Sequence, residues 1–146
     1  MRRAAAPVAV LTFEVDRMRF GVTVGSLVSL SLDPPLVGVS IGLEASTHEP
    51  LREAERFALS LLAGDQDGLA GHFARSVPPL VMWNGVAVRE GAGPPLLADA
   101  LGWIHCLRGD EHPVGDHTFF VGEVERVELG RDESALVYAR RGYHSV

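Results

Sequence analysis

Hydrophobic and polar side chains alternate along residues 17–32. The even positions from Met18 to Leu32 are apolar, with Ser26 as the one exception, whereas the odd positions, apart from Leu27, carry arginine, glycine and hydroxyl side chains. Because successive side chains of a strand point to opposite faces, the pattern predicts one core face and one small, polar face. Glycine weakens a strand interior unless a backbone or a ligand comes close. The glycines of this face therefore leave room for something flat, although a solvent-exposed strand edge explains the face equally well.

Apolar runs elsewhere predict further strands. A straight strand over residues 17–32 would be roughly 50 Å long at about 3.3 Å per residue, too long for a domain of this size, so we expect a corner at Gly25. The other expected strands cover residues 7–13, 36–41, 57–62, 86–88, 103–107, 117–129 and 135–139.

Two local features refine these strands. Glu14, Val15 and Asp16 separate the first two strands by a spacing that suits a hairpin. Within residues 117–129 the apolar positions change parity between Val124 and Leu129, which predicts a bulge near Arg126.

Helices are short and few in this pattern. Residues 46–56 and 65–74 predict two of them, with Asp65 as a candidate cap. Residues 75–95 contain four prolines and are typical of a long loop with a turn at Asn84-Gly85. Strands that follow one another without regular helical crossovers predict a single domain over residues 1–146. Its class is all-β, an antiparallel β-barrel with short helices.

Composition and charge limit the classes of partner that we expect for this protein. The formal charge is −6, with 47% apolar residues and no basic cluster that would follow a phosphate backbone, so we expect no nucleic-acid partner. Cys106 is the only cysteine, which excludes an intramolecular disulfide and a thiolate metal cluster and favours a cytoplasmic protein. The apolar run after Arg3 has no cleavage site and falls short of the ~20 residues of a membrane helix, so we expect no membrane partner.

Ser46 and Thr47 precede the first expected helix and are candidates for holding a phosphate, since hydroxyls and unpaired backbone N–H groups gather at such a position. The alternative is a capping box between Ser46 and Glu49. Pro50 affects both hypotheses, because it disfavours helical geometry at Glu49 and could delay the start of the helix to Pro50 itself.

Asp116 and His117 are the other polar pair beside an apolar strand. Neighbouring strand residues point to opposite faces, so we expect that Asp116 cannot orient the His117 ring as in a hydrolytic triad. His105 alternates with Trp103 and Leu107 and is typical of a packed strand histidine. No motif of a metalloprotease or of a serine hydrolase occurs. A binding surface without acid–base machinery indicates that a cofactor performs the reaction.

Three ordered segments cover nearly the whole chain and resemble one family. They are "GVTVGSLVSLSLDPPLVGVSI", "STHEPLREAERFALSLLAGDQDGLAGHFA" and "GDHTFFVGEV". They are similar to the flavin reductase-like proteins of the FMN-binding split-barrel fold. The resemblance implies a homodimer that binds FMN or FAD near the subunit interface and reduces it with NADH or NADPH. It also implies a partner flavin-dependent monooxygenase that receives the reduced flavin.

The same resemblance implies roles for individual residues. It places Val24, Gly25 and Ser26 at the isoalloxazine edge of the flavin, and Ser29, Ser31 and Asp33 at the ribityl chain. It assigns the phosphate to Ser46 and Thr47, and the nicotinamide side of the flavin to His117. Family members often carry Asn or Ala in place of Gly25 and Phe in place of Leu27, so a side-chain hydrogen bond to the flavin is missing here. The alternative function is a flavin-binding module, a carrier or sensor without reductase activity; a hydrolase that uses Asp116 and His117 ranks below both.

Overall fold

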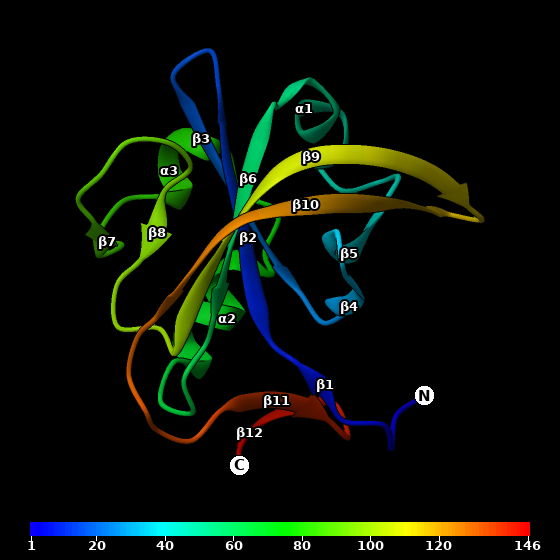
Figure 1. Ribbon diagram of the computed structural model, residues 1–146. Coiled ribbons are helices and arrows are strands. Elements are labelled where there is room, and N and C mark those ends of the chain that lie inside the picture. Colours follow the sequence, from blue (N-terminus) through cyan, green and yellow to red (C-terminus); the bar gives the residue numbers. More distant parts are fainter.

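The computed structural model describes residues 1–146, and a seven-stranded antiparallel sheet forms its centre (Figure 1). The strands follow the order β3-β2-β6-β9-β10-β5-β4. Their bounds in chain order are β2 Ala9–Val15, β3 Met18–Val24, β4 Val28–Leu32, β5 Pro35–Gly42, β6 Arg56–Leu61, β9 Gly102–Val114 and β10 His117–Leu129. The predicted all-β, antiparallel barrel is confirmed.

Short elements surround this sheet. Three helices, α1 (His48–Glu53), α2 (Asp67–Phe73) and α3 (Pro79–Met82), lie in its connections. A second small sheet joins β1 (Ala6–Pro7), β11 (Leu136–Ala139) and β12 (Gly142–Ser145), and β7 (Val88–Arg89) pairs with β8 (Leu96–Leu97). No helix of the structure has the length and apolar character needed to cross a membrane.

The barrel has an open seam. β3 and β4 are the two edges of the sheet and do not pair with each other, yet β3 lies close to β5, the neighbour of β4. The hairpin from β2 to β3 turns at Asp16 and Arg17, whose φ values of 51° and 66° are those of a two-residue turn. β3 ends before Gly25, and β4 then pairs with β5 on the other side of the seam, so the expected hairpin and corner are both confirmed.

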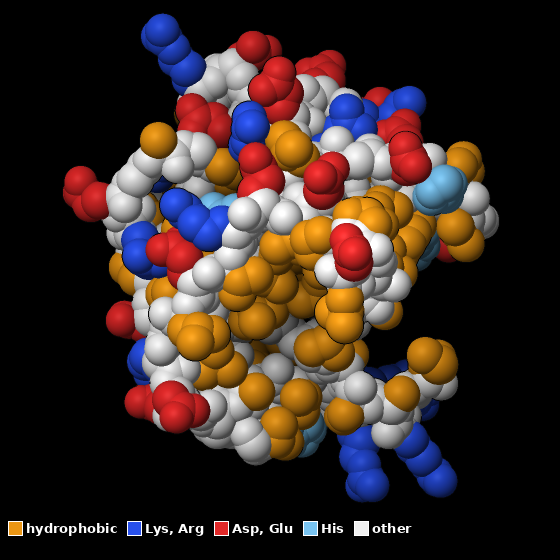
Figure 2. All heavy atoms as spheres, in the orientation of Figure 1, with side chains coloured by type: hydrophobic (Ala, Val, Ile, Leu, Met, Phe, Trp, Pro, Cys, Tyr) orange, Lys and Arg blue, Asp and Glu red, His pale blue; other side chains and the backbone are white.

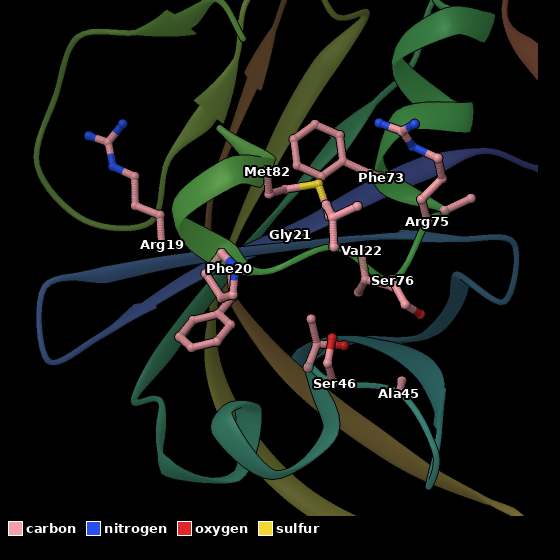
Figure 3. A pocket seen from close by; sticks show the side chains of 14 residues that line it. Arg19, Phe20, Gly21, Val22, Ala45, Ser46, Phe73, Arg75, Ser76 and Met82 are labelled. Carbon is pink, nitrogen blue, oxygen red and sulfur yellow. The ribbon is translucent and has the colours of Figure 1, made fainter. Parts of the chain in front are cut away.

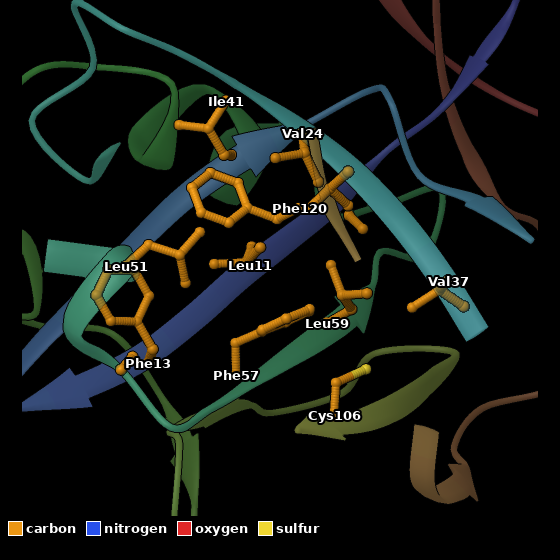
Figure 4. Close-up of a cluster of buried hydrophobic side chains, with 13 residues drawn as sticks. Leu11, Phe13, Val24, Val37, Ile41, Leu51, Phe57, Leu59, Cys106 and Phe120 are labelled. Atoms are coloured by element: carbon orange, nitrogen blue, oxygen red, sulfur yellow. The ribbon is translucent and has the colours of Figure 1, made fainter. Parts of the chain in front are cut away.

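A continuous core fills the barrel (Figure 4). Side chains from β2, β5, β6, β9, β10 and α1 meet there, and the largest fully buried ones include Phe13, Phe57 and Phe120. A fully buried aromatic or leucine side chain contributes about 2 to 3 kcal/mol, so this cluster is a principal stabilising element of the barrel.

The prediction of one core face along residues 17–32 is wrong beyond the corner. Val24 is 4% exposed, but Val28, Leu30 and Leu32 are 42%, 44% and 90% exposed. Because the chain crosses from one edge of the sheet to the other after Val24, the parity of β3 does not continue into β4. Edge position and a register shift between Ser29 and Ser31 leave the even side chains of β4 in solvent.

Several element boundaries differ from expectation. β9 runs to Val114 instead of ending near Leu107, because it forms one long hairpin with β10. The expected bulge is confirmed as a register shift between Val124 and Arg126. The proline-rich segment 75–95 contains α3, which was not expected, while the expected strand at 86–88 is found as β7 at Val88–Arg89. α2 starts at Asp67 with Gln66 at its N-cap, so Asp65 is not the cap and pairs with Arg131 instead.

Candidate cofactor groove

Two adjoining hollows follow β3 along the seam and form one groove. The first, of about 330 Å³, lies between the end of β3 and β5 and is lined by residues 22–26 and 40–42, Ala45 and His117. The second, of about 110 Å³, lies between the start of β3, the loop before α1 and the segment after α2 (Figure 3). Val22 and Ala45 line both hollows, so the two adjoin along β3.

Protein side chains fill the space beside the first glycine of β3. A Cβ atom on Gly21 would lie 2.6 Å from Cε1 of Phe73, whose ring packs edge-on against Trp83 with centroids 5.1 Å apart. Trp83 in turn donates its indole N–H to the backbone oxygen of Arg19 at 3.0 Å. The missing side chain of Gly21 therefore makes room for Phe73, although Gly21 also lines the second hollow. Gly25 lines the first hollow.

The corner after β3 is fastened across the seam. Ser26 Oγ accepts the N–H of Ser40 at 2.9 Å and donates to the oxygen of the same residue at 3.2 Å. The side chain of Val24 belongs to the core, so only its backbone can face the groove. The structure thus brings Val24, Gly25 and Ser26 together at one end of the groove.

Ser46 and Thr47 form the other end, and their hydrogen-bond donors are free. Their backbone N–H groups and the Ser46 hydroxyl make no hydrogen bond within the chain. The Oγ1 atom of Thr47 is buried without any partner, an arrangement that costs about 1 to 3 kcal/mol. Thr47 is the N-cap of α1 but makes no side-chain cap bond, so the capping box with Glu49 is not formed, and α1 starts at His48, before Pro50.

These free donors fit a phosphate. Two N–H groups and two hydroxyls within two consecutive residues match the several acceptor oxygens of such a group. Ser76 lies across the hollow from Ser46 (Figure 3). Arg75 lies at the rim, where its guanidinium contacts Nδ1 of His72 at 3.3 Å. Among these donors, the Thr47 hydroxyl is the buried side-chain group without a hydrogen-bond partner.

Asp116 does orient His117, so the expectation from strand geometry is wrong. Their Oδ1 and Nδ1 atoms lie 2.7 Å apart. Asp116 belongs to the turn between β9 and β10, after Gly115 with its φ of 60°, and is free of the alternation of a strand. The hydrogen bond and the charge of His117 hold the pKa of Asp116 below its ordinary value. No serine hydroxyl bonds to His117, so the pair is not part of a hydrolytic triad.

His117 borders the end of the groove at Ser26. Since its Nδ1–H is directed to Asp116, its Nε2 is left for the groove, and it lies 3.8 Å from the position of a Cβ on Gly42. The remaining predicted residues, Ser29, Ser31 and Asp33, belong to β4 and its turn and line neither hollow.

Sequence reasoning missed two residues beside the groove. His48 is buried and bonds to the hydroxyl of Thr118, the residue after His117. His105, in contrast, is packed on its strand as expected, with its Nε2 2.7 Å from Oε2 of Glu128. The alternation of β10 could have identified Thr118 as an inward-facing hydroxyl, but nothing local in the sequence pairs it with His48.

The antiparallel barrel has a groove along its open seam, with free hydrogen-bond donors at one end and an oriented histidine at the other, an arrangement that suits a phosphate-bearing cofactor. Residues 1–146 match the model of the flavin reductase-like domain. The chain belongs to this family, which confirms the resemblance of its motifs.

Proteins that are similar to this chain are named as flavin oxidoreductases or as reductase components. The NADH:riboflavin 5'-phosphate oxidoreductase of Streptomyces pristinaespiralis is 35% identical over 147 residues, 99% of this chain and 84% of that protein. The reductase component of 4-hydroxyphenylacetate 3-monooxygenase of Thermus thermophilus is 35% identical over 143 residues, covering 98% and 90%. A flavin reductase solved in complex with NADP⁺ superposes with a TM-score of 0.90 at 30% identity, covering 100% of this chain and 93% of that one.

Proposed function

We propose that this protein is an NAD(P)H-dependent flavin reductase that binds FMN or FAD in the groove along β3. Family membership and the names of the relatives support the reaction class. One observation supports the site: the groove has unpartnered donors of Ser46 and Thr47 at one end and the oriented side chain of His117 at the other.

The ends of the groove have different roles in this proposal. Ser46 and Thr47 hold the phosphate through their hydroxyls and backbone N–H groups. The backbone of Val24 and Gly25 borders the ring system, and Ser26 keeps this corner fixed against β5 through its two bonds to Ser40. Contacts from Ser29, Ser31 and Asp33 stay a prediction, which a single chain does not fulfil because β4 lies outside the groove.

A bound flavin and a dihydronicotinamide supply the hydride acceptor and the hydride donor. The chain contributes binding, orientation and exclusion of water, which can account for large rate effects when two reactants are held in register. We assign His117 as the residue that positions the nicotinamide: its ring is fixed by Asp116 on one side and presents Nε2 to the groove on the other.

The partner is proposed to be a flavin-dependent monooxygenase in the cytoplasm. Relatives are named as reductase components of a monooxygenase and of a tryptophan halogenase, which supports delivery of reduced flavin to a second enzyme. The comparisons give no support to a flavin-binding module without reductase activity, since the relatives are named for the reduction itself.

A homodimer is the proposed assembly. β4 is an edge strand whose apolar side chains Val28, Leu30 and Leu32 are exposed. Figure 2 shows hydrophobic side chains gathered over the middle of one face, which is hollowed near β4 and β10. Contiguous exposed apolar surface is typical of an interface, and a symmetric pair would bring β4 of one copy against its partner.

The test is oxidation of NADH or NADPH with added FMN, FAD or riboflavin. We expect flavin-dependent turnover, with the protein melting at a higher temperature when flavin is present, because a ligand that binds only the folded state stabilises it. Flavin binding without NAD(P)H oxidation would support the alternative, a carrier or sensor.

A further inference from the structure

His48 is a buried histidine with a partner on each ring nitrogen. It is 4% exposed. Its Nε2 lies 2.7 Å from Oγ1 of Thr118, and its Nδ1 lies 3.1 Å from Oε1 of Glu49. The ring also packs edge-on against Phe120 of the barrel core, with centroids 5.9 Å apart. The side chain is therefore fixed in position and direction.

The partners determine which groups donate. The Glu49 carboxylate only accepts, so Nδ1 of His48 carries the proton of that bond. In the neutral ring Nε2 then accepts from the Thr118 hydroxyl, and in the charged ring it donates to it. The contact between His48 and Thr118 persists in both states, so it is a permanent connection.

This contact joins the two ends of the groove. His48 directly follows Ser46 and Thr47, whereas Thr118 directly follows His117. The loop of residues 43–48 is attached to β10 and its turn at two points: the Leu43 N–H donates to the oxygen of Asp116 at 2.9 Å, and His48 bonds to Thr118. The stretch between them carries the free donors.

No other side chain holds this loop. The hydroxyls of Ser46 and Thr47 make no hydrogen bond within the protein, and their backbone N–H groups are also free. Apart from the Leu43 N–H, the backbone of the loop bonds only locally: Ala45 donates to Gly42, His48 donates to Ala45, and the Thr47 oxygen accepts the N–H of Leu51 in α1. Among side chains, the direction in which Thr47 presents its buried hydroxyl thus depends on the anchor at His48.

We propose that His48 is a positioning residue that holds the Ser46–Thr47 loop in register with His117, and that this register gives the site its preference for a phosphate monoester, FMN, over riboflavin, which lacks the phosphate. The proposal rests on the proposed function. The preference for FMN has a geometric cause, because the bond between His48 and Thr118 fixes the distance between the phosphate end and the hydride end of the groove.

The experiment compares the dissociation constants of FMN and riboflavin, measured by fluorescence titration of each variant. Thr118→Val removes only the hydroxyl that holds His48 and reaches neither flavin nor loop backbone. We expect the preference for FMN to fall by about threefold to tenfold, the effect of one hydrogen bond, with riboflavin affinity unchanged. His48→Leu should act in the same direction, and His48→Gln, which can still reach Thr118, should restore part of the preference.

Thr12→Val is the matched control. Thr12 is likewise a buried strand threonine whose hydroxyl makes one bond, to the oxygen of Pro95 at 2.5 Å, but it lines neither hollow and touches neither His48 nor the loop through that bond. A loss of preference in Thr118→Val that Thr12→Val does not share supports the proposal. An equal loss of preference in both variants overturns the proposal, because the loss would then be a general effect of destabilisation.

Two further outcomes separate this inference from the proposed function. If Thr47→Val lowers the preference for FMN and Thr118→Val leaves it unchanged, His48 does not position the loop, while the phosphate assignment stands. If wild type reduces flavins but binds FMN and riboflavin equally, the inference fails and reductase activity survives. If no flavin supports oxidation of NAD(P)H, the proposed function fails.

Discussion

The side chain of Ser26 closes the open seam of the barrel through the backbone of Ser40, with one hydrogen bond accepted at 2.9 Å and one donated at 3.2 Å. β3 and β5 have no ladder between them. This one hydroxyl therefore fixes the corner after β3, where the groove meets the strand that leads to the loop of Ser46 and Thr47.

Ser26→Ala should open this corner. Each part-buried hydrogen bond contributes about 1 kcal/mol, so we expect a loss of about 1 to 2 kcal/mol in unfolding free energy and a threefold to tenfold weaker affinity for FMN. Melting curves and flavin titration measure the two effects. Ser29→Ala is the control, because Ser29 is exposed and its side chain makes no hydrogen bond. Weaker FMN binding in Ser29→Ala would show that β4 of a second copy reaches the groove.

His117→Ala should impair hydride transfer more than flavin binding. Loss of the ring that borders the nicotinamide side is expected to lower kcat/KM for the nicotinamide by about tenfold to a hundredfold, since catalysis here depends on alignment. Asp116→Asn should give a smaller loss, because the ring stays but is less well oriented. Steady-state kinetics with fixed flavin distinguish the two. Unchanged kinetics in His117→Ala would remove the residue from the site.

The pH dependence of the Asp116→Asn effect follows from the lowered pKa of Asp116. Its hydrogen bond to His117 and the charge of that ring favour the carboxylate, so the group stays ionised below its ordinary value of 3.8. A lowered pKa means that the contribution of the pair is present above 3.8 and is lost as the pH falls through the lower, folded value. We expect wild type and Asp116→Asn to differ in kcat/KM throughout neutral and mildly acidic pH. A difference that already vanishes near pH 6 would contradict this.

The alternation of residues 17–24 predicted a strand correctly, because β3 is a regular strand with one face on the core. The same rule failed at Leu30 and Leu32, since parity carries no information across a corner that moves the chain to another edge of the sheet. Strand geometry likewise failed at Asp116, which belongs to a turn.

The candidate site was predictable only where a local motif carries it. Ser46, Thr47 and His117 could be identified from short segments that resemble a family. The contact between His48 and Thr118 spans 70 residues, and the contact of Phe73 with Gly21 is also long-range, so neither leaves a signal in local spacing. Such contacts depend on how the sheet closes, which periodicity does not specify.

Gly21 should tolerate no side chain. A Cβ there would lie 2.6 Å from the Phe73 ring and 3.3 Å from Trp83, so Gly21→Ala is expected to lower the unfolding free energy by about 1 to 3 kcal/mol through overpacking. Gly71→Ala, in α2, meets no atom within 4 Å and should be neutral or stabilising by up to about 1 kcal/mol. Urea denaturation of both variants checks the pair. A stable Gly21→Ala would mean that Phe73 moves freely.

Cys106 should be unreactive in the folded protein. Burial, and secondarily the charge of Glu125, raise the pKa of its thiol to about 12, and the residue is 1% exposed. Because the thiolate is the nucleophile, a thiol reagent at pH 8 should label only unfolded chains. The raised pKa stabilises the fold below the ordinary value of 9.0, and this contribution should be lost as the pH rises further. Rapid labelling of native protein at pH 8 would contradict the buried position.

The exposed apolar side chains of β4 should be needed for assembly. Leu32 is 90% exposed at the edge of the sheet, so placing a charge there with Leu32→Glu costs a single chain little, but it would bury an unpaired carboxylate in a symmetric interface. We expect Leu32→Glu to convert the proposed homodimer into monomers at micromolar concentration, as measured by light scattering. Leu80→Glu is the control: Leu80 is 80% exposed on α3, on a different element, and the variant should remain dimeric. If Leu80→Glu separates the subunits and Leu32→Glu does not, the interface lies at α3 and the loop around Trp83.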